Sequence, residues 1–252
     1  MKKSVRKVFA AFMAAAIIPT LVCSAEGTAP LEMYHDFTGV SVSEFEERNT
    51  DDGLGTYVAG GKIGYATVGS GQQGRVIEVV NDKLHLYGGA TPEGNTTANN
   101  KVYLSVYAPY IESYSDTTGN TKLVTSVTYA ANYAGNNNTD GIAIYGTAGE
   151  TTYTPVALCG LSRKNSSSPE SPVIRLGGSS GTSGTDYAAV ALTKDQQYRV
   201  DMITDLKAKT VDFYVDGEWK IQKTLNETVT SVEGFHIKLW REDEYTIDEI
   251  KA

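Results

Sequence analysis

The chain has 252 residues, a formal net charge of -8 at pH 7, 40% hydrophobic residues and two cysteines. Its 30 Asp and Glu, against 22 Lys and Arg, repel phosphate backbones and anionic lipid headgroups, which excludes nucleic acid and membrane surfaces as partners. The length is sufficient for one sizeable hydrophobic core without disulfide bonds.

The first 25 residues have the three parts of a secretory signal. The basic residues come first, at Lys2, Lys3, Arg6 and Lys7. An uncharged stretch from Val8 to Val22 follows, and the small residues Ser24 and Ala25 end the segment. A signal peptidase recognises this order, so we expect residues 1–25 to be removed and residues 26–252 to be secreted, either free or associated with the cell surface. Removal leaves 18 Lys and Arg (22 minus 4) against 30 Asp and Glu, a formal charge of -12.

Two alternatives to cleavage depend on individual residues. A membrane anchor needs about 20 apolar residues, whereas this stretch has 15 and contains Pro19. A lipid anchor on Cys23 requires a small residue before the cysteine, where Val22 stands. Cleavage without membrane insertion is the prediction that we adopt. It leaves Cys159 as the one cysteine, and its apolar surroundings predict a buried thiol and not a nucleophile.

Strand patterns dominate the mature chain, beginning with two hairpins. The segments Arg75 to Val80 and Lys83 to Tyr87 flank Asn81-Asp82, a pair that tolerates the positive φ of a tight turn. Tyr198 to Thr204 and Thr210 to Asp216 alternate apolar and polar residues on either side of a polar turn.

Further strands lie between loops rich in Gly, Ser, Thr and Asn. We expect them at Val102 to Tyr107, Leu123 to Ala130, Ile142 to Tyr145, Val173 to Leu176, Phe235 to Trp240 and Tyr245 to Ile250. Only Ser43 to Glu47 has the pattern of a helical turn. Short strands with such loops predict an all-β fold, a two-sheet antiparallel β-sandwich or jelly roll, as one domain over residues 26–252.

The C-terminal quarter carries a pattern that is typical of one class of module. It contains YRVDMITD, TVDFYVDGEW, FHIKLW and the closing YTIDEIKA. These sequences resemble the end of a concanavalin A-like (laminin-G-like) jelly-roll module, in which a closing I-D-x-I strand pairs near the first strand, here Met33 to Phe37. Modules of this kind are similar to those appended to secreted bacterial polysaccharide-degrading enzymes. The resemblance therefore implies that the chain binds carbohydrate.

Aromatic residues supply the candidate binding site. The face of an aromatic ring packs against the C–H face of a sugar, while its polar edge stays in water. Alternation along the strands places five candidates together on one sheet face, and a sixth follows the V-D-G turn at a loop rim: Tyr103, Tyr107, Tyr214, His236 and Trp240, then Trp219. The alternative is that these rings form cross-strand pairs that stabilise the sheet, or lie beneath loops.

A structural calcium ion is a second expectation from the resemblance, which implies Asp36 or Asp248 as ligands. Calcium takes about six to eight oxygen ligands, so two carboxylates are only part of such a site. The alternative is a solvated acidic edge. Asp248 stands in an otherwise apolar closing strand, where an unpaired inward carboxylate would be costly.

No catalytic signature accompanies these features. The E-x-D-x-x-E strand of laminarinase-type glycosidases, whose carboxylates lie about 5–5.5 Å apart, is missing from the acidic tail EDEYTIDEI. The R-T-E-x-R and Y-F-K-x-G strands of alginate-lyase-like jelly rolls are missing too, as is any H-x-x-x-H pair. We therefore expect a secreted, non-catalytic, lectin-like module that binds a polysaccharide. A polysaccharide hydrolase or lyase on the same fold, and a structural or adhesive surface domain, are the alternatives.

Overall fold

The computed structural model describes residues 33–48, 62–68, 74–89, 103–115, 122–133, 141–163, 172–177, 188–240 and 243–252. The predicted signal, residues 1–25, lies outside this part of the chain and stays a prediction. Most residues of the expected loops also lie outside the described part. Within the described residues, none of the helical structure is long and apolar enough to cross a membrane.

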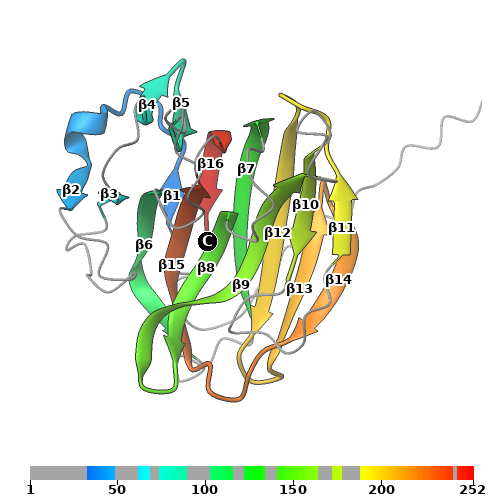
Figure 1. The fold of residues 1–252 in the computed structure, drawn as a ribbon. Coiled ribbons are helices and arrows are strands. Elements are labelled where there is room, and N and C mark those ends of the chain that lie inside the picture. The colour runs from blue at the N-terminus through cyan, green and yellow to red at the C-terminus, as the bar shows by residue number, and fades with distance from the viewer. Residues whose placement is uncertain are drawn as a thin grey trace, which may run out of the picture.

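Two antiparallel sheets make up the described chain (Figure 1). Sheet A has the order β14-β13-β12-β7-β16-β5-β4, with β1 paired to β16, and contains β1 (Tyr34–His35), β4 (Val76–Val80), β5 (Lys83–Tyr87), β7 (Leu123–Tyr133), β12 (Gln197–Asp205), β13 (Thr210–Val215), β14 (Glu218–Thr224) and β16 (Glu244–Lys251). Sheet B has the order β11-β10-β9-β8-β15-β6-β3-β2, and contains β2 (Glu46–Arg48), β3 (Gly64–Val68), β6 (Tyr103–Ser115), β8 (Gly141–Ala148), β9 (Thr151–Arg163), β10 (Pro172–Leu176), β11 (Ala188–Ala191) and β15 (Ser231–Trp240). Among the strands that the structure describes, only β2 and β3 pair in parallel. The predicted all-β, two-sheet antiparallel sandwich is confirmed.

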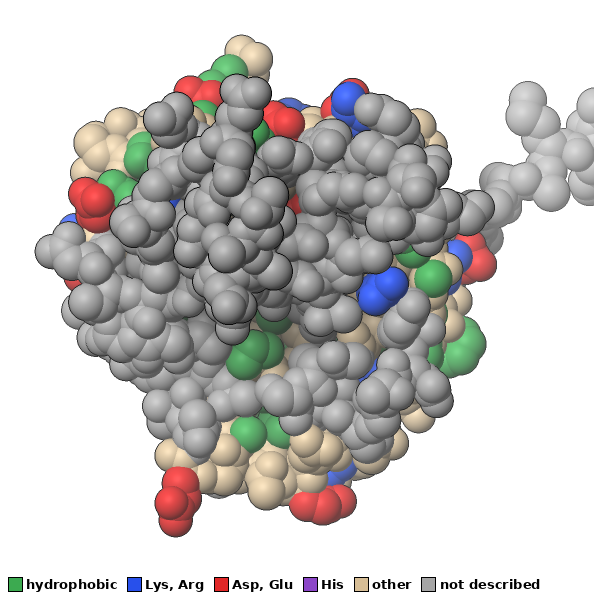
Figure 2. All heavy atoms as spheres, in the orientation of Figure 1, with side chains coloured by type: hydrophobic (Ala, Val, Ile, Leu, Met, Phe, Trp, Pro, Cys, Tyr) green, Lys and Arg blue, Asp and Glu red, His purple; other side chains and the backbone are tan. Residues whose placement is uncertain are grey.

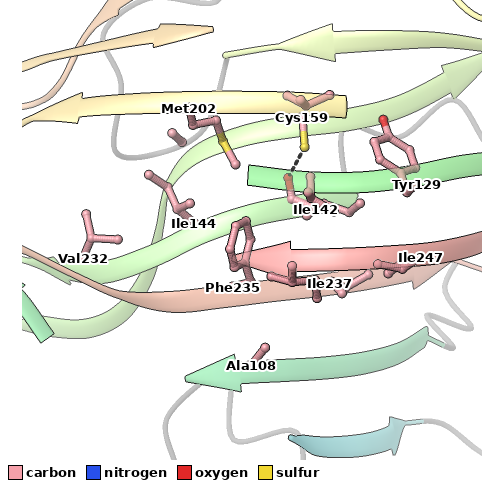
Figure 3. Packing of buried hydrophobic residues seen from close by; sticks show 14 of the residues in the cluster. Ala108, Tyr129, Ile142, Ile144, Cys159, Met202, Val232, Phe235, Ile237 and Ile247 are labelled. Carbon is pink, nitrogen blue, oxygen red and sulfur yellow. Dashed lines mark hydrogen bonds between the residues drawn. The ribbon is translucent and has the colours of Figure 1, made fainter. Parts of the chain in front are cut away.

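The core fills the space between the sheets. Along β13, Val211, Phe213 and Val215 are buried while the residues between them are half-buried, because successive side chains of a strand point to opposite faces. Figure 3 shows side chains from sheet A, such as Met202, and from sheet B, such as Phe235, directed into the same layer. Most charged side chains visible in Figure 2 lie instead at the edge of that view. The one core therefore follows from the alternation in the sequence.

The predicted turns and chain ends are also found. Asn81 and Asp82 have φ values of 53° and 58°, the left-handed pair that closes a two-residue hairpin between β4 and β5. The first and last strands pair through Tyr34 with Lys251, as expected for the closing strand. The helical turn expected over Ser43 to Glu47 is a single 3-10 turn, Val42–Glu44, capped by Ser41, and Glu46 and Glu47 belong instead to strand β2.

Strand β9 was not expected, although it spans Thr151–Arg163 between β8 and β10. Its sequence contains Pro155 and Gly160, two residues that weaken a strand pattern. The pairing of β8 with β9 shifts register between Ile144 and Tyr145, opposite Pro155. A bulge of this kind accommodates a proline that cannot donate a ladder hydrogen bond.

The predicted buried thiol is confirmed in β9. Cys159 is buried, and its Sγ–H donates to the Ile142 carbonyl oxygen of β8 at 3.0 Å (Figure 3). Burial raises the pKa of the thiol to about 12. A thiol of this kind is a packing group and not a nucleophile at neutral pH.

Candidate functional site

The outer face of sheet A carries one continuous row of side chains across six strands. Directly paired residues of antiparallel strands share a face, so the registers connect β1, β16, β7, β12, β13 and β14 in turn. We call this set the sheet A row, which consists of Tyr34, Lys251, Ser126, Asp201, Tyr214 and Trp219. With strands about 4.8 Å apart, its five spacings extend about 24 Å.

Trp219 is an exposed aromatic ring that is held by its own sheet. The side chain is 53% exposed. Its Nε1 donates to Asp212 Oδ1 at 3.0 Å, and Gln222 Nε2 donates to the same carboxylate at 3.1 and 3.2 Å. Asp212 lies two residues before Tyr214 on β13, so both side chains leave the same face. The hydrogen bonds fix the direction of the indole while about half of the residue's surface remains exposed to solvent.

The tight turn before Trp219 explains how the ring reaches this position. Asp216 and Gly217 have φ values of 51° and 81°, and they connect β13 directly to β14. The pairing then shifts register between Phe213 and Tyr214, which sets Trp219 opposite Tyr214. The V-D-G-x-W sequence thus places the tryptophan on an edge strand and not on a loop.

Asp201 and Arg199 form a rigid polar centre beside the aromatic residues. Asp201 is 5% exposed and accepts a hydrogen bond from Ser126 Oγ on β7. Arg199 Nε donates to Asp201 Oδ1 and Arg199 Nη2 donates to Oδ2, both at 2.8 Å. The hydrogen bonds from Arg199 to Asp201 raise the pKa of the guanidinium above its ordinary value. The half-exposed guanidinium is therefore held in one orientation in a bidentate ion pair.

The other half of the face is built from ion pairs. His85 bridges two strands, with Nδ1 2.9 Å from Glu78 Oε1 and Nε2 2.6 Å from Glu244 Oε1. Lys83 Nζ lies 2.9 Å from Asp248 Oδ1, and Lys251 Nζ lies 2.6 Å from Glu249 Oε1. These pairs connect β4, β5 and β16. Burial lowers the pKa of His85, but its bonds to Glu78 and Glu244 outweigh that effect and raise it above 6.5.

The five residues that were expected on one sheet face do not share it, which corrects that expectation. Tyr214 belongs to sheet A, whereas Tyr103, Tyr107, His236 and Trp240 belong to sheet B. The reason is that alternation assigns a side chain to a face of its strand, but only the crossover connections assign the strand to a sheet.

Tyr107 and His236 are buried in sheet B, contrary to the expectation of open rings. They are directly paired between β6 and β15, with ring centroids 4.9 Å apart and an interplanar angle of 13°. Their side chains are only 6% and 4% exposed. Burial, with a smaller effect of Lys238, lowers the pKa of His236 to about 3. This is the cross-strand pairing that the sequence left open as an alternative.

The remaining two aromatic candidates are placed only by their backbones. Tyr103 and Trp240 are paired across the same two strands of sheet B. Their side chains lie outside the part of the chain whose side chains the structure describes. Their contact with a ligand stays a prediction, as does that of Tyr214 and Trp219.

The two candidate calcium ligands have partners of their own. Asp36 Oδ1 accepts from the backbone N–H of Thr38 at 3.1 Å. Asp248 is not an unpaired inward carboxylate, because β16 shifts register between Ile247 and Glu249 and turns it outward to Lys83. Among the described residues, no group of three or more His, Cys, Asp and Glu side chains is placed to hold a metal ion. A calcium ion at this edge stays a prediction.

The sequence alone missed several members of the site, namely Tyr34, Ser126, Asp201 and Arg199. The alternation in YRVDMITD was sufficient to place Arg199 and Asp201 on one face, two residues apart. Their connection to Tyr34 and Ser126 depends on the registers of three strand pairs. No pattern within a single strand contains that information.

Comparison with known proteins gives similarity in architecture only. No protein-family model and no curated protein matches the sequence. Among solved structures, the chain is similar to a Lotus tetragonolobus seed lectin, with 16% identity, coverage of 87% of this chain and 96% of that chain, and a TM-score of 0.46. It is also similar to a marine PL7 alginate lyase from Zobellia galactanivorans, with 12% identity, coverage of 72% and 79%, and a TM-score of 0.41. A sialidase matches with 14% identity and a TM-score of 0.45. The match covers 75% of this chain but only 17% of the sialidase chain. The expected resemblance to concanavalin A-like jelly-roll proteins agrees with these matches.

Proposed function

We propose that the chain is a secreted, non-catalytic, lectin-like module that binds a polysaccharide through the outer face of sheet A. The observation that carries the proposal is the half-exposed Trp219, whose indole is fixed by Asp212 beside Tyr214. An immobilised ring loses little conformational entropy when a sugar packs on it. The predicted export signal agrees with a ligand outside the cell.

The polar members of the face supply the second element of sugar recognition. Sugar hydroxyls both donate and accept, so they match a surface with carboxylate acceptors and guanidinium donors. Asp212 and Asp201 offer carboxylate oxygens, and Arg199 is oriented by its bidentate pair. All three leave the same face as Trp219. The row is long enough, at about 24 Å, for a chain of sugars and not only for a single ring.

Affinity gel electrophoresis with residues 26–252 tests the proposal. The probes are soluble polysaccharides cast separately into the gel: laminarin, xylan, galactomannan, alginate and polygalacturonate. We expect retardation on at least one of them, and a loss of about tenfold in affinity for Trp219→Ala, since an aromatic contact contributes about 1–1.5 kcal/mol.

The matched control is Val80→Ala. Val80 is also an exposed apolar side chain, but it lies on β4 at the far edge of the same sheet. It should leave retardation unchanged. A folded sample that no glycan retards, or Trp219→Ala binding as well as Val80→Ala, would overturn the proposal.

A polysaccharide lyase is the second candidate, and one observation favours it. Tyr107 and His236 form a stacked phenol–imidazole pair on adjacent central strands of sheet B. The low pKa of His236, caused first by burial, keeps the imidazole neutral at neutral pH, as a general base must be, but it also makes the imidazole a weak base. Release of unsaturated sugars that absorb in the ultraviolet, abolished by His236→Ala, would establish this candidate. We expect no release, since both side chains are buried.

A structural or adhesive spacer is the third candidate. It predicts that the aromatic side chains of the sheet faces are covered. Tyr34 and Trp219, which stand at the two ends of the sheet A row, are instead 58% and 53% exposed. This exposure favours a binding surface over a spacer.

A further inference from the structure

Every basic side chain that the described strands of sheet A direct to the outer face is bound to a carboxylate. The four on the strands β4 to β12 are Lys83 with Asp248, His85 with Glu78 and Glu244, Arg199 with Asp201, and Lys251 with Glu249. On the edge strand β14, Lys220 binds Glu218 at 2.8 Å. Lys223 of β14 is buried and pairs with the inward-facing Val211, so it does not join this face.

The face also carries acidic charge in excess. The carboxylates on the same strands are Glu78, Asp201, Asp205, Asp212, Glu244, Asp248 and Glu249. Seven negative charges against four positive ones give 4 − 7 = −3 even when His85 is protonated. Lys220 and Glu218 cancel each other and leave this difference unchanged. Among the described residues, the side chains that donate to Asp212 are the neutral Trp219 and Gln222.

The charge balance distinguishes between two chemical classes of glycan. A uronate polysaccharide carries a carboxylate on each sugar, and along this face it meets net negative charge and cations that are already paired. Displacing one of those pairs would leave a carboxylate without its partner, which costs free energy most strongly at the buried Asp201. A neutral polysaccharide offers hydroxyl donors to the same carboxylates and C–H faces to Trp219. Like-charge repulsion therefore acts against the first class alone.

We infer that the ligand of the sheet A face is a neutral polysaccharide, and that the face discriminates against uronate polysaccharides. This inference rests on the proposed function and names the class of glycan for the same site. The ion pairs then have two roles. They rigidify the sheet, and they remove the cations that would otherwise attract acidic glycans.

The test compares retardation by laminarin, xylan and galactomannan with retardation by alginate and polygalacturonate at low ionic strength, where electrostatic effects are largest. We expect at least one neutral glycan to be bound about fivefold or more tightly than either uronate, the factor that one like-charge contact near 4 Å in water supplies. Raising the salt concentration should leave the neutral complex unchanged. Equal or stronger binding to a uronate polysaccharide, weakened by salt, overturns the inference and leaves the proposed function standing. Retardation by none of the five probes overturns the proposed function itself.

Two substitutions that free a cation sharpen the test. Glu249→Gln releases Lys251 at the surface, and Asp201→Asn releases Arg199. Each changes the charge of the face by one unit, and we expect alginate retention to rise by about fivefold. Glu249→Gln remains informative if the buried Asp201→Asn fails to fold.

The matched control for both is Glu227→Gln. It removes the same charge from an exposed turn after β14, away from the sheet A row. A rise in alginate retention that is equal for Glu227→Gln and Glu249→Gln would show an effect of overall charge, and would overturn the role of the ion pairs on the face.

Discussion

Arg199 binds the buried carboxylate of Asp201, two residues further along β12, through two nitrogens that each lie 2.8 Å from a carboxylate oxygen. A carboxylate that is 5% exposed depends on such donors, because an unpaired buried charge is strongly unfavourable. Ser126 supplies the other donor from β7. The pair therefore supports both the stability of sheet A and the orientation of its polar centre.

Arg199→Ala should lower the free energy of unfolding by about 1–3 kcal/mol, since it leaves Asp201 with Ser126 as its remaining side-chain donor. The lower end is expected because the guanidinium is half-exposed and screened by water. Urea unfolding measures the change. Lys220→Ala, which breaks the surface pair with Glu218, is the control and should cost less than about 1 kcal/mol. Equal losses of unfolding free energy for the two variants would contradict the larger contribution to stability that we expect from the Arg199–Asp201 pair.

Trp219 should report binding directly by its fluorescence. A sugar that covers the half-exposed indole removes water from it, so emission should move to shorter wavelength during titration with a bound glycan. Trp219→Phe keeps an aromatic face but loses the donor to Asp212 and the signal. Trp240, the other tryptophan, supplies the emission that remains in this variant. A shift that persists in Trp219→Phe would show that the ligand binds elsewhere.

The local structure of the chain could be predicted from the sequence wherever one segment contained the whole signal. The Asn81-Asp82 hairpin is an example, because its two strands and its turn are contiguous. Strand β9 could not be predicted, since Pro155 and Gly160 interrupt its pattern and the strand forms by pairing with β8 and β10. Local residue preferences therefore determine turns and faces, and tertiary contacts determine which weak segments become strands.

The candidate site depends on information of longer range. Tyr34 and Trp219 are far apart in the sequence, and they belong to one row only through five successive strand registers. The grouping of Tyr214 with Tyr107 failed for the same reason, because their strands lie in different sheets. The outward direction of Tyr214 could be predicted, since alternation within β13 is sufficient for it.

Cys159 should resist thiol reagents in the folded protein. Its thiol is buried, donates to the Ile142 carbonyl, and has a pKa of about 12, so little thiolate exists at neutral pH. Residues 26–252 contain this cysteine alone. A chromogenic disulfide reagent should label no thiol in the native state and one thiol per chain in urea. Rapid labelling of the native protein would contradict the packing of β9 against β8.

His85 should make the protein more stable at mildly acidic pH. Burial lowers its pKa, but Glu78 and Glu244 raise it above 6.5 in the folded state. A raised folded pKa adds stability that is fully present below 6.5 and is lost as the pH rises through the folded value. His85→Gln should therefore destabilise the protein more at about pH 5.5 than at about pH 8.5. Unfolding by urea at the two pH values measures this, and a loss that does not depend on pH would contradict the bridged imidazolium.

His236 should make the protein less stable as the pH falls, which is the opposite of the effect of His85. Burial and, to a smaller extent, Lys238 lower its pKa to about 3, whereas the unfolded chain has its ordinary value of 6.5. Between these values the unfolded state binds the extra proton, so stability should fall by about 1.4 kcal/mol for each pH unit below 6.5. His236→Gln cannot take up that proton, and the free energy of unfolding should depend less on pH between about 6 and 4.

The two histidines can be separated in one pH series, because removing His85 and removing His236 change the slope of stability against pH with opposite signs. Proton NMR of the wild-type imidazoles gives a check that needs no variant. The resonance of His85 should titrate above 6.5, and that of His236 should stay in its neutral position down to at least pH 5, about two units above its folded pKa. Titration of His236 near 6.5 would mean that the Tyr107–His236 stack is open to water, and would restore sheet B as a candidate binding or catalytic face.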